Sequence, residues 1–156
     1  MPFNSNGVLP PGFHDWELEE IEENLVVNFS KSKTRSRIFS GYTKLLKKLK
    51  SFKLEAEQWL DGSFSTTKVN PGDLDMLTII EANQLNKIDP SKGAELKTLF
   101  DGPNTKKDYL CDSYILAKRD KSDPNYEYYR KMHKYWYGEF SLDRSFSPKG
   151  IVRVKS

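Results

Sequence analysis

The segment LDMLTII, residues 74–80, constrains the fold of this chain more than any other feature. It is apolar and rich in β-branched residues, as expected of a buried strand. Upstream, the stretch from Thr34 to Ser51 has helical periodicity, with Tyr42 and several leucines on one side and lysines largely on the other. A buried strand beside an amphipathic helix predicts a sheet with helices packed against it.

Other patterns extend this arrangement into an α/β, more narrowly α+β, fold. Asp89-Pro90 and Asp123-Pro124 each join an N-cap residue to a Pro at the first helical position, which predicts one helix reaching Phe100 and another ending near Gly138. We expect a further helix to begin near Asp15. The other expected strands are EQWLDGS, Tyr109–Ala117 and the tail GIVRV. We therefore predict one domain over residues 1–156, with a short mixed β-sheet backed by helices and an extended segment at residues 1–12.

Composition limits the classes of protein to which the chain can belong. No stretch approaches the roughly 20 apolar residues that cross a bilayer, and the N-terminus lacks the layout of a signal peptide, so we expect a cytoplasmic protein that is not in a membrane. The single Cys111 cannot form an internal disulfide and is expected to be a buried small residue. His14 and His133 show no zinc-site spacing, and a net charge of +3 is only weak evidence for nucleic-acid binding.

The pattern that indicates chemistry is Gly62-Ser63 followed, after nine intervening residues, by Asp73-Leu74-Asp75-Met76. Alternate residues of a strand point to the same face, so Asp73 and Asp75 would present two carboxylates side by side. Adjacent carboxylates repel unless a cation lies between them, and their oxygen atoms suit Mg²⁺, or Mn²⁺ in its place. A Gly-Ser turn offers amide and hydroxyl donors at close approach to phosphates. The two halves together predict a site for a metal and a nucleotide.

A third carboxylate on a neighbouring strand would complete such a site. Asp112 is our choice, because apolar residues flank it, whereas Asp108 lies nearer a polar linker. Gly-Ser is a common loop dipeptide and Asp-x-Asp alone is weak. Average residue frequencies nevertheless put the combined pattern at roughly one chance in a hundred for a chain of this size.

The stretch WLDGSFSTTKVNPGDLDML resembles the signature of the DNA-polymerase-β-like nucleotidyltransferase superfamily. The segments VLPPGFH and YWYGEFSLDRSFSPKGIV also look like a minimal branch of small, largely uncharacterised bacterial proteins assigned to that fold. The resemblance implies transfer of a nucleoside monophosphate from a nucleoside triphosphate to a hydroxyl. It implies that Asp73 and Asp75 hold two metal ions, that Asp112 binds the catalytic one and orients or deprotonates the acceptor, and that Gly62 and Ser63 grip the phosphates.

Weaker features leave alternatives open. Arg144 and Lys149 are candidates for contacts with the triphosphate, against a purely surface role. The aromatic residues of the last helix suit either a base-stacking platform or, more commonly, packing on the sheet. The acceptor that the resemblance implies is RNA, a tRNA end or a protein, with a partner protein and a toxin–antitoxin or defence system as plausible settings. The rival hypotheses are a non-catalytic, antitoxin-like interaction module of the same fold and, last, a nucleic-acid-binding domain.

Overall fold

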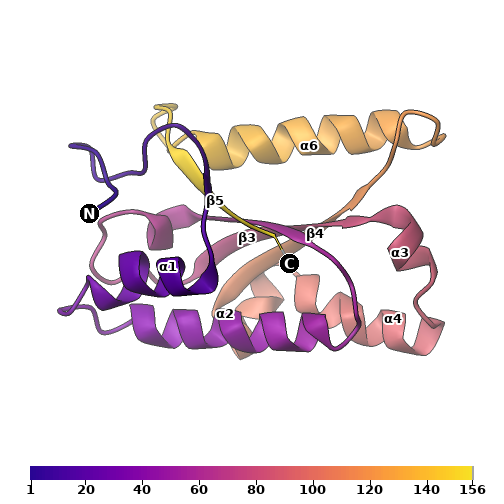
Figure 1. Ribbon diagram of the computed structural model, residues 1–156, viewed down its shortest axis with the longest axis horizontal. Helices are drawn as coiled ribbons and strands as arrows, with labels where there is room; N and C mark the ends of the chain where they lie inside the picture. Colours follow the sequence, from indigo (N-terminus) through magenta and orange to yellow (C-terminus); the bar gives the residue numbers. More distant parts are fainter. Residues whose placement is uncertain (156) are drawn as a thin grey trace.

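Five strands form one mixed sheet in the computed structural model, which describes residues 1–155 (Figure 1). Their order across the sheet is β1-β5-β2-β3-β4. The two outer pairings, β1 with β5 and β3 with β4, are parallel, and the two central pairings are antiparallel. The strands span Gly12–Asp15 (β1), Glu57–Asp61 (β2), Leu74–Glu81 (β3), Cys111–Lys118 (β4) and Gly150–Lys155 (β5). The predicted short mixed sheet is confirmed.

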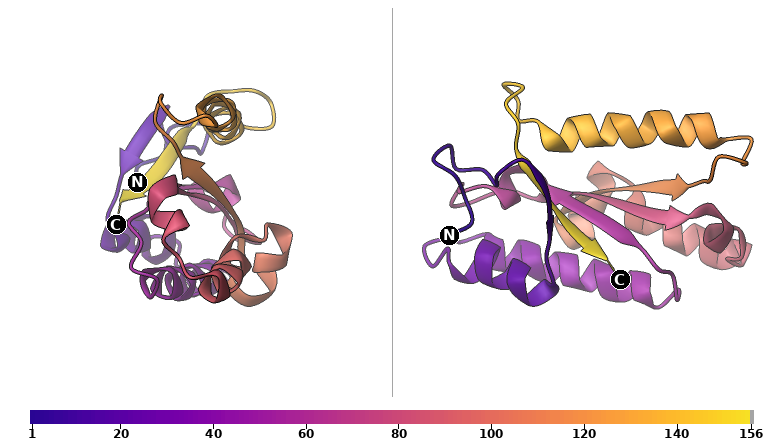
Figure 2. Two further views of the ribbon diagram at one scale, coloured as in Figure 1. Left: turned by 90° about the vertical axis from the view of Figure 1, so that its right-hand side faces the viewer. Right: turned by 45° about the horizontal axis from the view of Figure 1, so that its top comes forward.

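Helices cover both faces of this sheet. In Figures 1 and 2, α6 runs alone along one face, while α1, α2 and α4 lie against the other. The helices span Leu18–Glu22 (α1), Arg35–Lys50 (α2), Ala82–Asn86 (α3), Pro90–Lys97 (α4), Lys106–Tyr109 (α5) and Tyr126–Ser141 (α6), and a π-helical turn, Glu23–Val27, continues α1. The predicted α+β class is therefore confirmed, with the sheet as the middle of three layers. No helix within residues 1–155 combines the length and the apolar surface needed to cross a bilayer.

Two apolar cores lie on the two faces of the sheet. The larger one joins the sheet to α1, α2 and α4 and includes Leu45, Leu60 and Met76. Within it, the Tyr42 hydroxyl donates to Gln58 Oε1 at 2.7 Å. Cys111 is also fully buried there, as predicted.

The smaller core lies under α6, where Tyr129 and Trp136 of the helix pack against a cluster that includes Trp59 and Leu77 of the sheet. These contacts confirm sheet packing for one side of the aromatic helix. His133 is half-buried with its ring against Trp59, as expected of a helix residue. Tyr128 and Tyr135 are exposed on the other side of α6, whereas the partly exposed Tyr137 has its ring against Phe13 and Trp59 of the sheet.

Several predicted boundaries of helices and strands were wrong. The helix expected near Asp15 begins only at Leu18, because Gly12–Asp15 forms a strand. This strand pairs in parallel with β5, and such a pairing has no local signature in the sequence. The helix expected to end at Gly138 continues to Ser141, since this glycine keeps a helical conformation. The strand expected from Tyr109 begins at Cys111, because the short helix α5 and the left-handed Leu110 (φ 54°) precede it.

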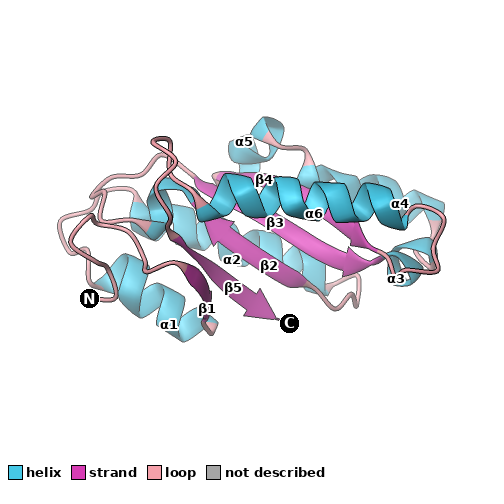
Figure 3. Cartoon of the chain, turned by 90° about the horizontal axis from the view of Figure 1, so that it is seen from above, coloured by secondary structure: helices cyan, strands magenta, loops and turns pink. Residues whose placement is uncertain are grey.

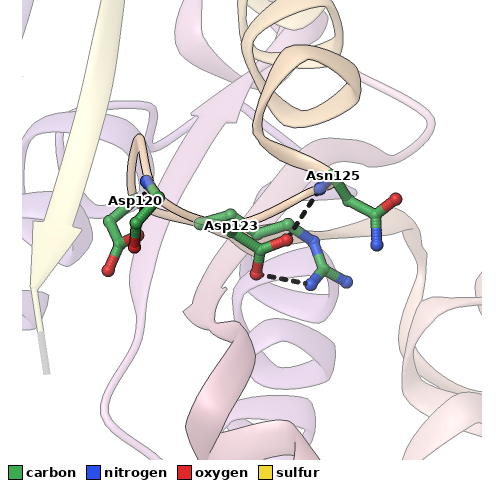
Figure 4. Close-up of polar contacts among 5 residues, drawn as sticks. Asp120, Asp123 and Asn125 are labelled. Carbon is green, nitrogen blue, oxygen red and sulfur yellow. Dashed lines mark hydrogen bonds and ion pairs between the residues drawn. The ribbon is translucent and has the colours of Figure 1, made fainter.

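The start of α6 also differs from the prediction, since Asn125 rather than Asp123 is its N-cap residue. Asp123 still organises the turn, as Figure 4 shows. One of its carboxylate oxygens accepts from the Asn125 backbone N–H at 2.7 Å, and the other binds Arg119 Nη1 at 3.1 Å. The Asp-Pro pattern thus marks the turn before the helix, two residues away from the cap.

Candidate active site

Three neighbouring strands, β2, β3 and β4, place carboxylates at the same end of the sheet. In the strand register, Asp75 of β3 lies opposite Asp61 at the end of β2 and beside Asp112 of β4. Residues paired in this way point to the same face of a sheet. Here it is the face covered by α6, because Trp59 and Leu77, two positions away along β2 and β3, belong to the core under that helix. Asp61, Asp75 and Asp112 therefore form a row.

This row lies in a cleft of about 750 Å³ under the C-terminal end of α6, the helix that crosses over the sheet in Figure 3. Tyr135 and Glu139 of α6 line its helical side. All seven residues singled out from the sequence also line it: Gly62, Ser63, Asp73, Asp75, Asp112, Arg144 and Lys149. Residues far apart in the sequence are thus brought together around one cavity, as the pattern requires.

Gly62 begins the turn that follows β2, and its geometry requires glycine. Its φ is +79°, in the left-handed region that disfavours residues with a Cβ. A Cβ at this position would also overlap the Asp75 carboxylate. The chain then makes a 3-10 turn, Gly62–Ser65, closed by hydrogen bonds from Thr66 to the Ser63 carbonyl. The backbone of the turn therefore passes directly beside the carboxylates.

A buried arginine on α2 binds the backbone of this turn and of the residues that follow it. The Arg35 guanidinium donates to the carbonyls of Leu25 and Phe64 through Nη1 (2.8 and 2.6 Å), and to those of Thr66 and Lys68 through Nη2 (2.6 Å each). No carboxylate pairs with it among residues 1–155, and burial lowers its pKa to about 10, which leaves it charged at neutral pH. Arg35 therefore fixes the backbone between residues 64 and 68 and is inaccessible to a ligand.

Asp61 holds the turn from the other side and also binds Lys149. Its Oδ1 accepts from Lys149 Nζ at 2.9 Å and from the Ser65 hydroxyl at 3.2 Å. Both members of the pair are buried, with side-chain exposures of 2% for Asp61 and 10% for Lys149. Burial raises the pKa of Asp61 to about 7, although the Lys149 ammonium opposes this shift. Lys149 is therefore a buried, paired residue that borders the cleft.

The remaining carboxylates differ in how they are satisfied. Asp73 is bound by Lys106 Nζ at 2.7 Å, in a half-exposed ion pair from α5. Asp75 has no such partner among residues 1–155, and its pKa is raised to about 6, first by burial and then by the charges of Asp73 and Asp112. Asp112 Oδ1 is a buried oxygen that accepts no hydrogen bond from the described part of the chain. Within residues 1–155, Asp75 and Asp112 thus have no ion-pair partner of their own, and the more distant charges of Lys106 and Lys149 only partly offset the raised pKa of Asp75.

The carboxylates of the cleft are the oxygen ligands that a divalent cation would use. Within residues 1–155, no three Asp, Glu, His or Cys side chains converge as a complete metal centre. The unsatisfied Asp112 Oδ1 and the raised pKa of Asp75 are nevertheless the features that a hard cation would relieve. Asp75 and Asp112 are therefore the residues that could hold a cation, and Asp73 could join them only by exchanging Lys106 for the metal.

Arg144 lies in a tight turn between α6 and β5. Asp143 Oδ1 shapes that turn by accepting from the backbone N–H groups of Ser145 (2.8 Å) and Ser147 (2.9 Å). Arg144 itself is exposed at the rim of the cleft and makes no ion pair among the described residues. Its side chain is therefore available to an anion in the cleft.

Comparison with known proteins gives a family for this chain. Residues 1–155 match a family described as a family of unknown function, DUF6932. The chain belongs to this DUF6932 family. The comparisons with curated proteins and with solved structures found no match.

In this DUF6932 chain, sequence reasoning did not identify two residues that shape the site. Asp61 directly precedes Gly62, and the alternation of β2 puts it on the same face as Trp59, so a local signal was present. Lys106 had no local signal, because its contact with Asp73 depends on where α5 packs. Lys106 binds Asp73 and its charge opposes the raised pKa of Asp75, whereas Asp61 acts on the site by holding Lys149.

Proposed function

We propose that this protein is a metal-dependent nucleotidyltransferase with the superfamily's fold, acting in the cytoplasm. It would transfer a nucleoside monophosphate from a nucleoside triphosphate to a hydroxyl of RNA, a tRNA end or a protein. One observation carries the proposal: Asp75 and Asp112 lie in register on adjacent parallel strands, with Asp73 and the Gly62 turn beside them in one cleft. This is the arrangement expected where clustered carboxylates and phosphates must be held together.

Each residue has a role that follows from its position. Asp73, Asp75 and Asp112 would hold Mg²⁺ or Mn²⁺, which supplies positive charge to the phosphates. Asp112 would accept the proton of the acceptor hydroxyl while the hydroxyl oxygen bonds to the α-phosphorus. The bond between the α-phosphorus and the bridging oxygen would break in the same step, and pyrophosphate would leave. Amide and hydroxyl groups of Gly62 and Ser63 would donate to phosphate oxygens.

The test is label transfer from α-labelled nucleoside triphosphates in Mg²⁺, with total RNA and cell protein as acceptors. Wild type is compared with Asp73→Asn/Asp75→Asn, which keeps side-chain shape and removes two negative charges. The control, Asp108→Asn/Asp120→Asn, makes the same charge change at two exposed residues outside the cleft. We expect transfer by wild type and control, and background transfer by the cleft variant. Equal transfer by all three proteins would refute the proposal.

A second candidate function has its own supporting observation. Lys106 and Lys149 already neutralise Asp73 and Asp61, so part of the carboxylate cluster is satisfied without a metal. This favours a non-catalytic interaction module, antitoxin-like, that binds a partner protein. It predicts that no pyrophosphate is released with any donor, while the partner copurifies with both wild type and Asp73→Asn/Asp75→Asn.

A further inference from the structure

The Asp61–Lys149 pair is the part of the cleft that the proposed roles do not use. It joins the end of β2 to the residue immediately before β5, 88 positions further along the chain. Asp61 is 2% exposed, and Lys149 is also buried while lining the cleft. An ion pair at such burial is costly to desolvate and is therefore weak as a stabilising device. Its position in the cleft suggests another role.

The backbone of Lys149 is fixed on both sides. Its N–H donates to the Ser141 carbonyl at 2.8 Å, and the next N–H, of Gly150, donates to the Leu9 carbonyl at 2.8 Å. A Cβ on Gly150 would overlap the Pro10 carbonyl, so the chain passes here in close contact with the N-terminal segment. The Lys149 side chain is thus attached to a backbone that is held in place, which restricts where its ammonium group can lie.

Asp61 fixes the position of the Lys149 ammonium group. An ammonium has three N–H donors, and Asp61 Oδ1 is the acceptor recorded for Lys149 Nζ in the described residues. The same oxygen binds the Ser65 hydroxyl, so Lys149 Nζ is held beside the Gly62–Ser65 turn. Two donors remain for oxygen atoms that enter the cleft.

We propose that Asp61 is a positioning residue, which holds the Lys149 ammonium so that it binds a phosphate oxygen of the nucleotide beside the Gly62 turn. This inference rests on the proposed function for the identity of the ligand. It adds a residue that acts through another and does not itself contact the substrate. Held in advance, the ammonium loses little side-chain entropy on binding, which favours affinity.

The experiment measures binding by calorimetry, without an acceptor, using ATP, tripolyphosphate and adenosine as separate probes. A hydrogen bond from a charged group predicts that Lys149→Met weakens ATP and tripolyphosphate binding about ten- to hundredfold and leaves adenosine unchanged. Asp61→Asn should show the same selectivity with a smaller loss. In the double variant the loss should equal that of Lys149→Met alone, because Asp61 acts only through Lys149.

Two outcomes would overturn the inference. Additive losses in the double variant would mean that Asp61 acts independently, and unchanged tripolyphosphate affinity in Lys149→Met would mean that the ammonium does not bind phosphate. If the variants fail to fold by circular dichroism, the wild-type protein with ¹³Cε-labelled lysine is titrated with tripolyphosphate. The assigned Lys149 signal should then shift, and an unmoved signal under saturation would also overturn the inference.

The same measurements separate this inference from the proposed function. Tripolyphosphate binding that depends on Lys149, with no label transfer under any condition, would support the inference and refute the enzyme. Label transfer with an unchanged KM for the nucleotide in Lys149→Met would support the enzyme and refute the inference. A raised KM with little change in kcat is the result expected if both hold.

Discussion

Arg35 provides the most direct test of how the chain around the Gly62–Ser65 turn is held. Its guanidinium makes four hydrogen bonds of 2.6 to 2.8 Å to backbone carbonyls and stacks 3.7 Å above the Phe29 ring. Arg35→Met keeps most of the side-chain volume but removes every donor. At about 1 kcal/mol for each hydrogen bond, the expected loss is about 4 kcal/mol in the free energy of unfolding. That is a large part of the usual total of about 5–15 kcal/mol.

The matched control is Arg37→Met, at an exposed position two residues further along the same helix. It removes the same charge, and its effect should stay within about 0.5 kcal/mol. Urea unfolding followed by tryptophan fluorescence measures both variants. With a slope of about 2 kcal/mol per molar urea, Arg35→Met should lower the midpoint by about 2 M.

Hydrogen exchange then locates the effect. The amides of residues 64–68 should lose protection in Arg35→Met and keep it in Arg37→Met, because the carbonyls of that segment lose their donors. Arg35→Lys, which keeps the charge without the planar fork, should fall between the two. A midpoint for Arg35→Met equal to that of Arg37→Met would refute the reasoning that these hydrogen bonds hold the turn.

Three further predictions concern the carboxylates. Gly62→Ala should lower the free energy of unfolding by at least about 1–2 kcal/mol in urea titrations, because φ is +79° and the new Cβ meets Asp75; an unchanged midpoint would contradict this. Asp112→Asn should raise the urea midpoint, since it removes a charge from a repelling cluster, and should abolish Mn²⁺ binding in calorimetry, whereas Asp108→Asn should do neither. The pKa of Asp75 is raised to about 6, so its protonation favours the folded state below about pH 4 and this stability is lost as the pH rises through 6. The urea midpoint of Asp75→Asn, relative to that of the wild type, should accordingly rise between pH 4 and pH 8. A difference between the two midpoints that does not change with pH would count against the raised pKa.

Local patterns were sufficient for the elements nearest the site. The long amphipathic stretch predicted from Thr34 to Ser51 is α2, with those two residues as its caps, and the apolar segment from Leu74 became β3. The apolar neighbours of Asp112 correctly assigned it to a strand, whereas Asp73 lies just before β3 and is joined to Asp75 only by lining the same cleft. Periodicity reports the surroundings of each residue along its own element, which explains why these predictions held.

What the sequence by itself determined is therefore the set of elements around the Gly62 turn and the Asp73–Asp75 pair. Only the tertiary structure decided that β1 pairs with β5, that Asp61 lies opposite Asp75, and that Lys106 and Lys149 neutralise two of the carboxylates. Those contacts join residues that are distant along the chain. They depend on strand register and on how helices pack, which no local pattern encodes, so the charges of the cleft emerge only when the whole sheet is assembled.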